Sequence, residues 1–147
     1  MSQRFFLDSN PGSDRLAAGD AITLEGDQAH HAINVMRFNA GDQIVLFDGT
    51  GIEYVATVEE VQKKSISLAI IESVENSRSL KTSITIAVAL PKGDRQKFLV
   101  EKLVELGVQT LIPLKTKRAV AVPNPKVIAR LSKQVVEASK QCGRATR

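Results

Sequence analysis

The sequence has few of the residues that build metal sites, disulfides and membrane spans. Among its 147 residues are one cysteine, two histidines and no tryptophan. Cys142 cannot form an internal disulfide, and no second cysteine lies nearby to complete a zinc site. No apolar run approaches the roughly 20 residues of a membrane-crossing helix. The N-terminal stretch MSQRFFLDSN contains no apolar segment of signal-peptide length. We therefore expect a cytoplasmic protein with no membrane partner and no metal site.

The glycine-rich motifs of nucleotide-binding loops are also missing. The turn at residues 91–95, PKGDR, follows an apolar run and precedes a helical pattern, which is the position of a phosphate-binding loop. Its single glycine matches neither GxGxxG nor GxxxxGK[ST], so the sequence predicts no dinucleotide or ATP site there. Lys92 and Arg95 remain candidates for holding an RNA phosphate. Asp94 is interpreted as the N-cap of the following helix.

Charge is divided unevenly along the chain. Residues 1–74 hold 5 Lys/Arg and 11 Asp/Glu, a balance of −6, whereas residues 75–147 hold 15 and 5, a balance of +10. The polar stretch ESVENSRSLKT separates the two parts. We expect one domain over residues 1–74, a linker over 75–82 and a second domain over 83–147. The basic half favours nucleic acid over an anionic membrane as partner, although a solvated charged surface would carry the same residues.

The first half reads as short strands around one helix. Apolar residues at 29, 32, 33 and 36 form one helical face, with Asp27 available as N-cap, while His30, Asn34 and Arg37 gather on the other side. This polar cluster could hydrogen-bond a phosphate or a base edge. Alternatively, His30 and Arg37 are the solvated face of an amphipathic helix, and His31 is a partly buried, hydrogen-bonded residue. The pattern predicts a small β-barrel flanked by a helix over 27–38, with strands at 4–7, 21–24, 43–47, 52–61 and 65–71.

The second half predicts a βαβ unit. Apolar runs at 84–90 and 108–114 flank a helical pattern that stops at Gly107, and strands joined in this way lie parallel. Lys92 and Arg95 then share the carboxyl edge of the sheet with the residues after the second strand, Lys115, Lys117 and Arg118. Lys97, Glu101, Lys102 and Glu105 are better explained as helix-surface ion pairs than as acid–base residues.

A second amphipathic helix closes the chain. Asn124 followed by Pro125 is a helix-start signal, and a short strand is expected just before it, at 119–122. Cys142 falls on the apolar face and is interpreted as a core residue. The opposite face carries Lys126, Arg130, Lys133, Glu137, Lys140 and Arg144.

Several motifs together resemble the RsmE family of ribosomal RNA methyltransferases. They are RFFLD, HHAINVMR, GDQIVLFDGTG, LPKGDRQKFLVEKLVELGVQTLIPL, KRAVAV and EASKQCGR, in order along nearly the whole chain. The resemblance implies a PUA-like RNA-binding β-barrel followed by a SPOUT α/β domain with a C-terminal knot, working as a homodimer. It also implies methylation of uridine N3 in small-subunit (16S) ribosomal RNA with S-adenosylmethionine as methyl donor.

The resemblance singles out residues by their place in these motifs. Arg4, His31 and Arg37 in the first domain, and Lys92, Arg95 and Arg118 in the second, are expected to bind RNA. Glu137, Gln141 and Arg144 match the last motif, and Arg144 is our candidate for positioning the substrate near the active site. An exposed charge on a solvated helix face is the alternative for Arg144.

The methyl donor raises a separate expectation. Family members continue well past the motif that ends at Gly143 and Arg144, and the donor pocket lies in that later part, whereas this sequence stops at Arg147. We therefore expect a truncated, inactive form that contains the first part of the SPOUT domain and no cofactor-binding residue. A non-catalytic RNA-binding module and a dimerising scaffold remain as alternatives.

Overall fold

The chain forms two compact units, Met1–Ser77 and Arg78–Arg147. The computed structural model describes residues 4–8, 15–75, 78 and 80–145. Unit 1 and unit 2, as we call them, each enclose a hydrophobic core of their own. None of the described helices is long and apolar enough to cross a membrane.

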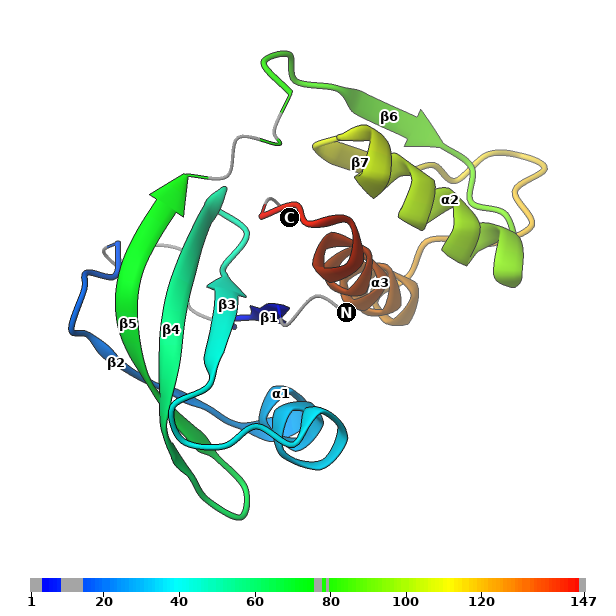
Figure 1. Cartoon of the computed structure of the whole chain (residues 1–147). Coiled ribbons are helices and arrows are strands. Elements are labelled where there is room, and N and C mark those ends of the chain that lie inside the picture. The colour runs from blue at the N-terminus through cyan, green and yellow to red at the C-terminus, as the bar shows by residue number, and fades with distance from the viewer. Residues whose placement is uncertain (1–3, 9–14, 76–77, 79, 146–147) are drawn as a thin grey trace. The chain divides into compact units, whose positions relative to one another are not determined.

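Unit 1 is built on one curled sheet of five strands, which confirms the prediction that the first half of the chain is rich in strands (Figure 1). The strand order is β1-β3-β4-β5-β2, with β1 parallel to β3 and the other neighbours antiparallel. Register shifts at Val55/Ala56 and Val58/Glu60 interrupt the long β4–β5 ladder, and such bulges bend a sheet and increase its twist. The strands are β1 (Arg4–Phe6), β2 (Ala21–Leu24), β3 (Gln43–Phe47), β4 (Ile52–Val61) and β5 (Ile66–Glu75).

Alternation of side chains decides which face of this sheet is buried. Ile66, Leu68 and Ile70 of β5 are 0–2% exposed, and the residues between them are half-buried. The predicted end of this strand at residue 71 was wrong, because β5 stays paired with β4 as far as Glu75, opposite Ile52. The strand thus continues into the polar stretch from which the domain boundary was predicted.

The helix of unit 1 is not the single α-helix that the sequence predicts. α1 (Gly26–His30) continues as a π-helix, η1 (His31–Met36), and Glu25 rather than Asp27 is the N-cap. The predicted apolar face is confirmed, since Ala29 and Ala32 are fully buried and Ile33 and Met36 pack against the core. The segment ends at Arg37, which adopts a left-handed backbone conformation with φ 56°.

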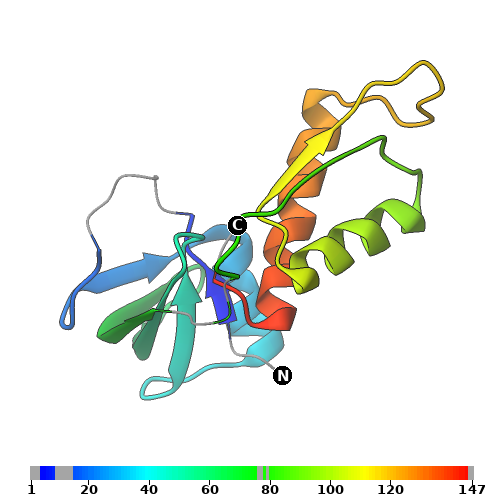
Figure 2. The same cartoon turned by 90° about the horizontal axis from the view of Figure 1, so that it is seen from above.

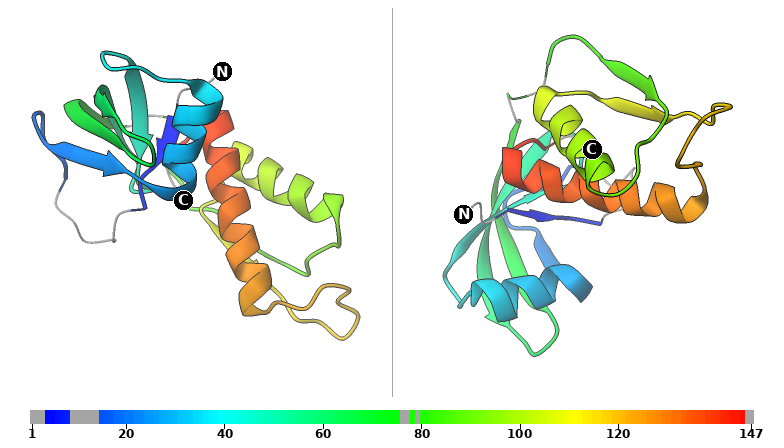
Figure 3. Two further views of the ribbon diagram at one scale, coloured as in Figure 1. Left: turned by 90° about the horizontal axis from the view of Figure 1, so that it is seen from below. Right: turned by 90° about the vertical axis from the view of Figure 1, so that its right-hand side faces the viewer.

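Unit 2 contains the predicted βαβ arrangement followed by a long helix (Figures 2 and 3). β6 and β7 pair in parallel, from Thr85 opposite Thr110 to Val88 opposite Pro113. The core of the unit lies between the two helices, where Val100 and Val104 meet Leu131 and Ala138, and Cys142 packs against it half-buried, as predicted. The elements are β6 (Thr85–Val88), α2 (Asp94–Leu106), β7 (Thr110–Pro113) and α3 (Pro125–Cys142).

Two local predictions near α3 have opposite outcomes. The N-cap is confirmed, because the Val127 N–H donates to Asn124 Oδ1 at 3.0 Å and Pro125 begins the helix. The predicted strand at 119–122 is wrong. The Ala119 N–H instead donates to the Thr116 carbonyl at 3.1 Å in a turn, and these residues pair with no strand in the part of the chain that is described. High β propensity without a partner strand is not enough to form a sheet.

The single tyrosine reports on the core of unit 1. Tyr54 is 2% exposed, and its hydroxyl donates to Asp48 Oδ2 at 3.2 Å. Burial, and secondly the negative charge of Asp48, raise the pKa of Tyr54 above its ordinary value of 10.0. We expect tyrosinate absorbance to develop above that pH in the folded protein, and Asp48→Asn to move its midpoint downward.

The raised pKa of Tyr54 makes the stability of the folded protein depend on pH in the alkaline range. The unfolded chain loses the tyrosine proton before the folded chain does, so the stabilisation is complete below the unfolded pKa and is lost as pH rises through the folded pKa. Urea unfolding on either side of this range measures the effect. If the tyrosinate absorbance has the same midpoint pH in the wild type and in Asp48→Asn, this carboxylate does not cause the pKa shift.

Candidate nucleic-acid interface

The parallel strands of unit 2 bring two basic loops to one edge. Because β6 and β7 run in the same direction, the loops that follow them both leave from the carboxyl edge, and the Leu114 N–H extends the ladder by donating to the Val88 carbonyl at 2.9 Å. The predicted shared edge is therefore confirmed. We call the five exposed cations of these loops and of the first turn of α2 the basic rim: Lys92, Arg95, Lys115, Lys117 and Arg118.

The rim side chains are available for a ligand. In the described part of the chain, none of the five forms a side-chain hydrogen bond or an ion pair. Cations without internal partners keep their full charge for an external anion, and phosphate is the anion that clustered Lys and Arg bind in nucleic acids. The RNA contacts predicted for Lys92, Arg95 and Arg118 are compatible with this placement and stay predictions.

The first turn of α2 begins differently from the prediction. Gly93, with φ 59° and ψ −140°, is the N-cap, and Asp94 is the first helical residue, so the predicted cap at Asp94 is wrong. No side chain caps this end of the helix. The Gln96 N–H donates instead to the Gly93 carbonyl at 3.0 Å. The backbone N–H groups of such a turn add a partial positive charge to that of Lys92 and Arg95.

A polar groove runs between α2 and α3. It encloses about 330 Å³ and is lined by Lys97, Glu101, Arg130, Lys133, Gln134, Glu137, Ala138 and Gln141. Each of its two carboxylates forms an ion pair with a lysine. Lys97 Nζ lies 3.7 Å from Glu101 Oε1, as predicted, and Lys140 Nζ lies 2.9 Å from Glu137 Oε1. Arg130 and Lys133 therefore leave the groove with a surplus of positive charge. Glu137 and Gln141, which the family motif singles out, both border it.

Arg130, which lines the groove, contacts a residue that sequence reasoning missed. Gln96 is 2% exposed, and its Oε1 accepts a hydrogen bond from the guanidinium of Arg130. Within the described residues the Gln96 side-chain nitrogen has no hydrogen-bond partner, nor does Oε1 of Gln134. The sequence gives no signal for this pairing, because the two partners are 34 residues apart and each alone reads as a surface residue of its helix.

Arg144 does not lie on the solvated helix face predicted for it. α3 ends at Cys142, and Gly143 turns the chain with φ 74°. Arg144 consequently lies outside the helix, and the residue is only 9% exposed. Its guanidinium lies over the backbone of Gly107, at the C-terminal end of α2, where the helix dipole favours a cation. The alternative of an exposed charge is thus wrong, and the substrate-positioning role stays a prediction.

Gly107 has two independent reasons to be glycine. Its φ of +88° disfavours any side chain, and a Cβ there would lie 2.7 Å and 2.8 Å from the two terminal nitrogens of Arg144. We expect Gly107→Ala to destabilise unit 2 by about 1–2 kcal/mol, measured by urea unfolding.

A double-mutant cycle separates the two causes. In the background of Arg144→Ala the crowding by the guanidinium is relieved, so the same substitution at Gly107 is expected to cost less. The backbone strain remains, as does the close contact of the added Cβ with Leu80 Cδ1 at 2.9 Å. An equal cost in both backgrounds would show that the guanidinium does not contribute.

The residues predicted in unit 1 lie in different environments. Arg4 forms an ion pair with Glu53, its guanidinium lies 5.1 Å from the Phe47 ring centre, and its side chain is 10% exposed. It is therefore largely committed to the fold. His31 and Arg37 are exposed, and the His31 ring packs 6.0 Å from that of Phe5. The structure leaves RNA binding by all three as a prediction, and only the last two present their side chains to solvent.

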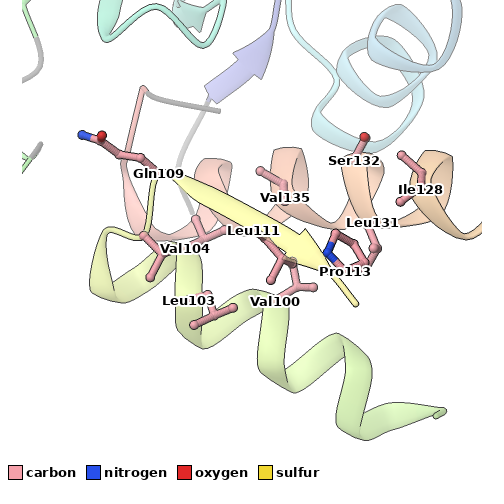
Figure 4. A pocket seen from close by; sticks show the side chains of 11 residues that line it. Val100, Leu103, Val104, Gln109, Leu111, Pro113, Ile128, Leu131, Ser132 and Val135 are labelled. Carbon is pink, nitrogen blue, oxygen red and sulfur yellow. The ribbon is translucent and has the colours of Figure 1, made fainter. Parts of the chain in front are cut away.

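Two other cavities differ from the groove in chemistry. In unit 1, a cavity of about 480 Å³ is bordered by Asp8, Glu25 and Asp48, whose charges oppose a phosphate. In unit 2, a cavity of about 200 Å³ lies between α2, β7 and α3, as Figure 4 shows, and only Gln109 and Ser132 interrupt its aliphatic lining. It lacks a charged group and is smaller than the roughly 300–1,000 Å³ of most ligand pockets.

Comparison with known proteins identifies the family of both units. Residues 24–71 match the RNA methyltransferase PUA domain, and residues 78–147 match the RNA methyltransferase domain. Ribosomal RNA small subunit methyltransferase E of Bacillus subtilis is 33% identical over 80% of this chain. The chain belongs to the RsmE family. Unit 1 is accordingly a PUA-like domain, and unit 2 is the first part of a SPOUT-type methyltransferase fold.

Other RsmE relatives agree in extent and fold. The enzyme of Rickettsia conorii is 32% identical over 91% of this chain. The crystal structure of the Neisseria gonorrhoeae enzyme bound to S-adenosylmethionine superposes with a TM-score of 0.87 at 30% identity, covering 99% of this chain and 59% of the other. A Legionella pneumophila protein solved with the same cofactor gives 0.84 at 29% identity. The chain spans about half the length of the curated relatives, 45% and 54% for the two named.

Proposed function

We propose that this chain serves S-adenosylmethionine-dependent methylation of uridine N3 in 16S ribosomal RNA, and that unit 2 holds the RNA. The observation that carries the proposal is the basic rim, with five cations that have no internal partner in the described residues. Membership of an RNA methyltransferase family supplies the reaction class. The RNA substrate and the homodimer implied by the family are part of the same proposal.

The chemistry explains why cations are needed at such a site. Uridine N3 carries a weakly acidic proton that must leave before or while the N–C bond forms, so positive groups that favour the uridine anion lower the barrier. The rim binds the phosphates on either side of the target. In the polar groove, Arg130 and Lys133 lie close to Glu137 and Gln141 and could hold a neighbouring nucleotide.

The methyl donor does not fit the apolar cavity of unit 2. S-adenosylmethionine supplies an electrophilic methyl group when it is bound, and it needs partners for an adenosine and for a charged methionine moiety. The apolar cavity of unit 2 is too small and carries no charge. We therefore assign no residue of this chain to the cofactor, and we propose that the chain alone is inactive. This mismatch also favours the second candidate function, an RNA-binding module without chemistry.

RNA binding through the rim has a measurable salt signature. Each phosphate contact contributes about 0.7 to the slope of log K against log salt for single-stranded RNA. We expect Lys92→Ala combined with Arg95→Ala to lower the slope by about 1–1.5 in fluorescence titrations with an RNA hairpin. The control is Lys63→Ala with Lys64→Ala, which removes the same charge from the turn between β4 and β5. Equal slopes for the two double variants would contradict the proposal.

Calorimetry tests whether the chain binds the methyl donor. Titration of the chain with S-adenosylmethionine is expected to give no binding heat. A saturable heat signal would show that the chain does hold the donor. It would overturn our assignment of no residue to the cofactor and remove the ground for proposing an inactive chain.

A further inference from the structure

Arg37 adopts a backbone conformation that this chain gives to glycine elsewhere. Its φ of 56° and ψ of 46° end η1, whereas α2 and α3 end in the same left-handed region at Gly107 and Gly143. Among the described residues it is the one non-glycine residue with positive φ. The left-handed backbone conformation is less favourable for a residue with a side chain than for glycine, because Cβ crowds the following carbonyl.

The side chain of Arg37 makes no contact in the described residues that would offset this backbone strain. It is exposed, and within the described part of the chain it forms no hydrogen bond, ion pair or ring contact. The turn is held by groups that glycine would leave intact. Asn39 Nδ2 donates to the Arg37 carbonyl at 3.3 Å, and the Phe38 N–H donates to the Ala32 carbonyl at 3.3 Å. The guanidinium is thus kept at a strained position with no internal task.

The neighbouring residues form a small surface of unusual composition. We call it the π-turn surface, and it consists of the exposed residues His30, His31, Asn34, Val35 and Arg37. Val35 is 59% exposed, and the His31 ring rests near the ring of Phe5, which is 1% exposed and so gives it a fixed support. His31 and Val35 lie about one turn apart in η1, and single π-helical turns occur frequently at functional sites.

The charge of unit 1 decides between two kinds of RNA contact. Residues 1–74 carry a balance of −6, which opposes the binding of phosphate. The face of a nucleobase is uncharged and stacks on aromatic rings and guanidinium planes. We infer that the π-turn surface binds an unstacked base of single-stranded RNA, with His31 and Val35 under the base and Arg37 beside it. The inference rests on the proposed function for the identity of the ligand as RNA.

Arg37→Gly in the full chain tests the strain and the contact together. Relief of the left-handed side chain is expected to raise the Tm by about 2–6 °C. Loss of the guanidinium is expected to weaken binding to a fluorescent RNA hairpin with a single-stranded loop by about five- to tenfold. Greater stability with unchanged affinity would overturn the inference, because it would show that Arg37 has no external partner.

His31 tests whether the contact is to a base. His31→Ala is expected to weaken binding of the looped hairpin about fivefold with no change in salt slope, and His31→Phe, which keeps a flat ring, to restore it. A fully paired RNA of the same length should bind the wild type and His31→Ala equally. A fall in the salt slope, or an equal loss on paired RNA, would overturn base binding in favour of phosphate contact.

A matched control variant separates a general loss of positive charge from the loss of the base contact. Lys63→Ala removes an exposed cation from the same unit and should leave the looped hairpin bound as in the wild type. Wild-type affinity in all the His31 and Arg37 variants would overturn this inference alone. Failure of the wild-type chain to bind either RNA would overturn the proposed function as well.

Discussion

The parallel pairing of β6 with β7 is the constraint that gathers the cations of unit 2. An antiparallel pair would send the two loops to opposite edges, and Lys92 and Arg95 would be separated from Lys115, Lys117 and Arg118 by the length of the strands. The connection through α2 fixes the parallel direction. α2 in turn is held by Val100 and Val104 against α3. Burial of aliphatic side chains therefore determines where the positive charge is displayed.

The division of charge suggests a division of tasks in RNA binding. Unit 2 has the surplus of cations that phosphate binding needs, and two of its carboxylates at the polar groove are paired with lysines. Unit 1 is acidic, and Arg4, one of its few arginines, is committed to Glu53 and Phe47. What the π-turn surface of unit 1 presents instead is two imidazole rings, an exposed aliphatic side chain and one guanidinium. Those groups suit a base better than a phosphate backbone, and our proposal for unit 1 is therefore a base contact.

The sequence predicted the elements whose signals are local. The aliphatic spacing of α2 and α3, the Asn124 cap and the glycine stop at Gly107 each depend on a few neighbouring residues, and all were confirmed. The π-helix was missed because a helix of the ordinary period and a π-helix place the apolar residues 29, 32, 33 and 36 on nearly the same face. The spacing alone cannot distinguish the two over so short a segment.

The site was less predictable, because its defining contacts join distant residues. Arg144 was placed on the face of α3 by continuing the helical period past Gly143, and a glycine in the left-handed region ended that period. Its contact with Gly107 and the pairing of Gln96 with Arg130 arise only when α2 and α3 pack. Burial of Arg4 likewise follows from the pairing of β1 in the sheet, and nothing in the first strand itself signals it.

The central claim is that RNA meets this chain at the basic rim and at the π-turn surface. Backbone NMR spectra of the labelled chain, recorded during titration with the looped RNA hairpin, test it most directly, because every amide near the RNA reports separately. The account predicts the largest shifts at residues 92–95, 115–118 and 30–37. Shifts confined to the outer strands of unit 1, or an absence of shifts in both predicted regions while RNA binds, would contradict it.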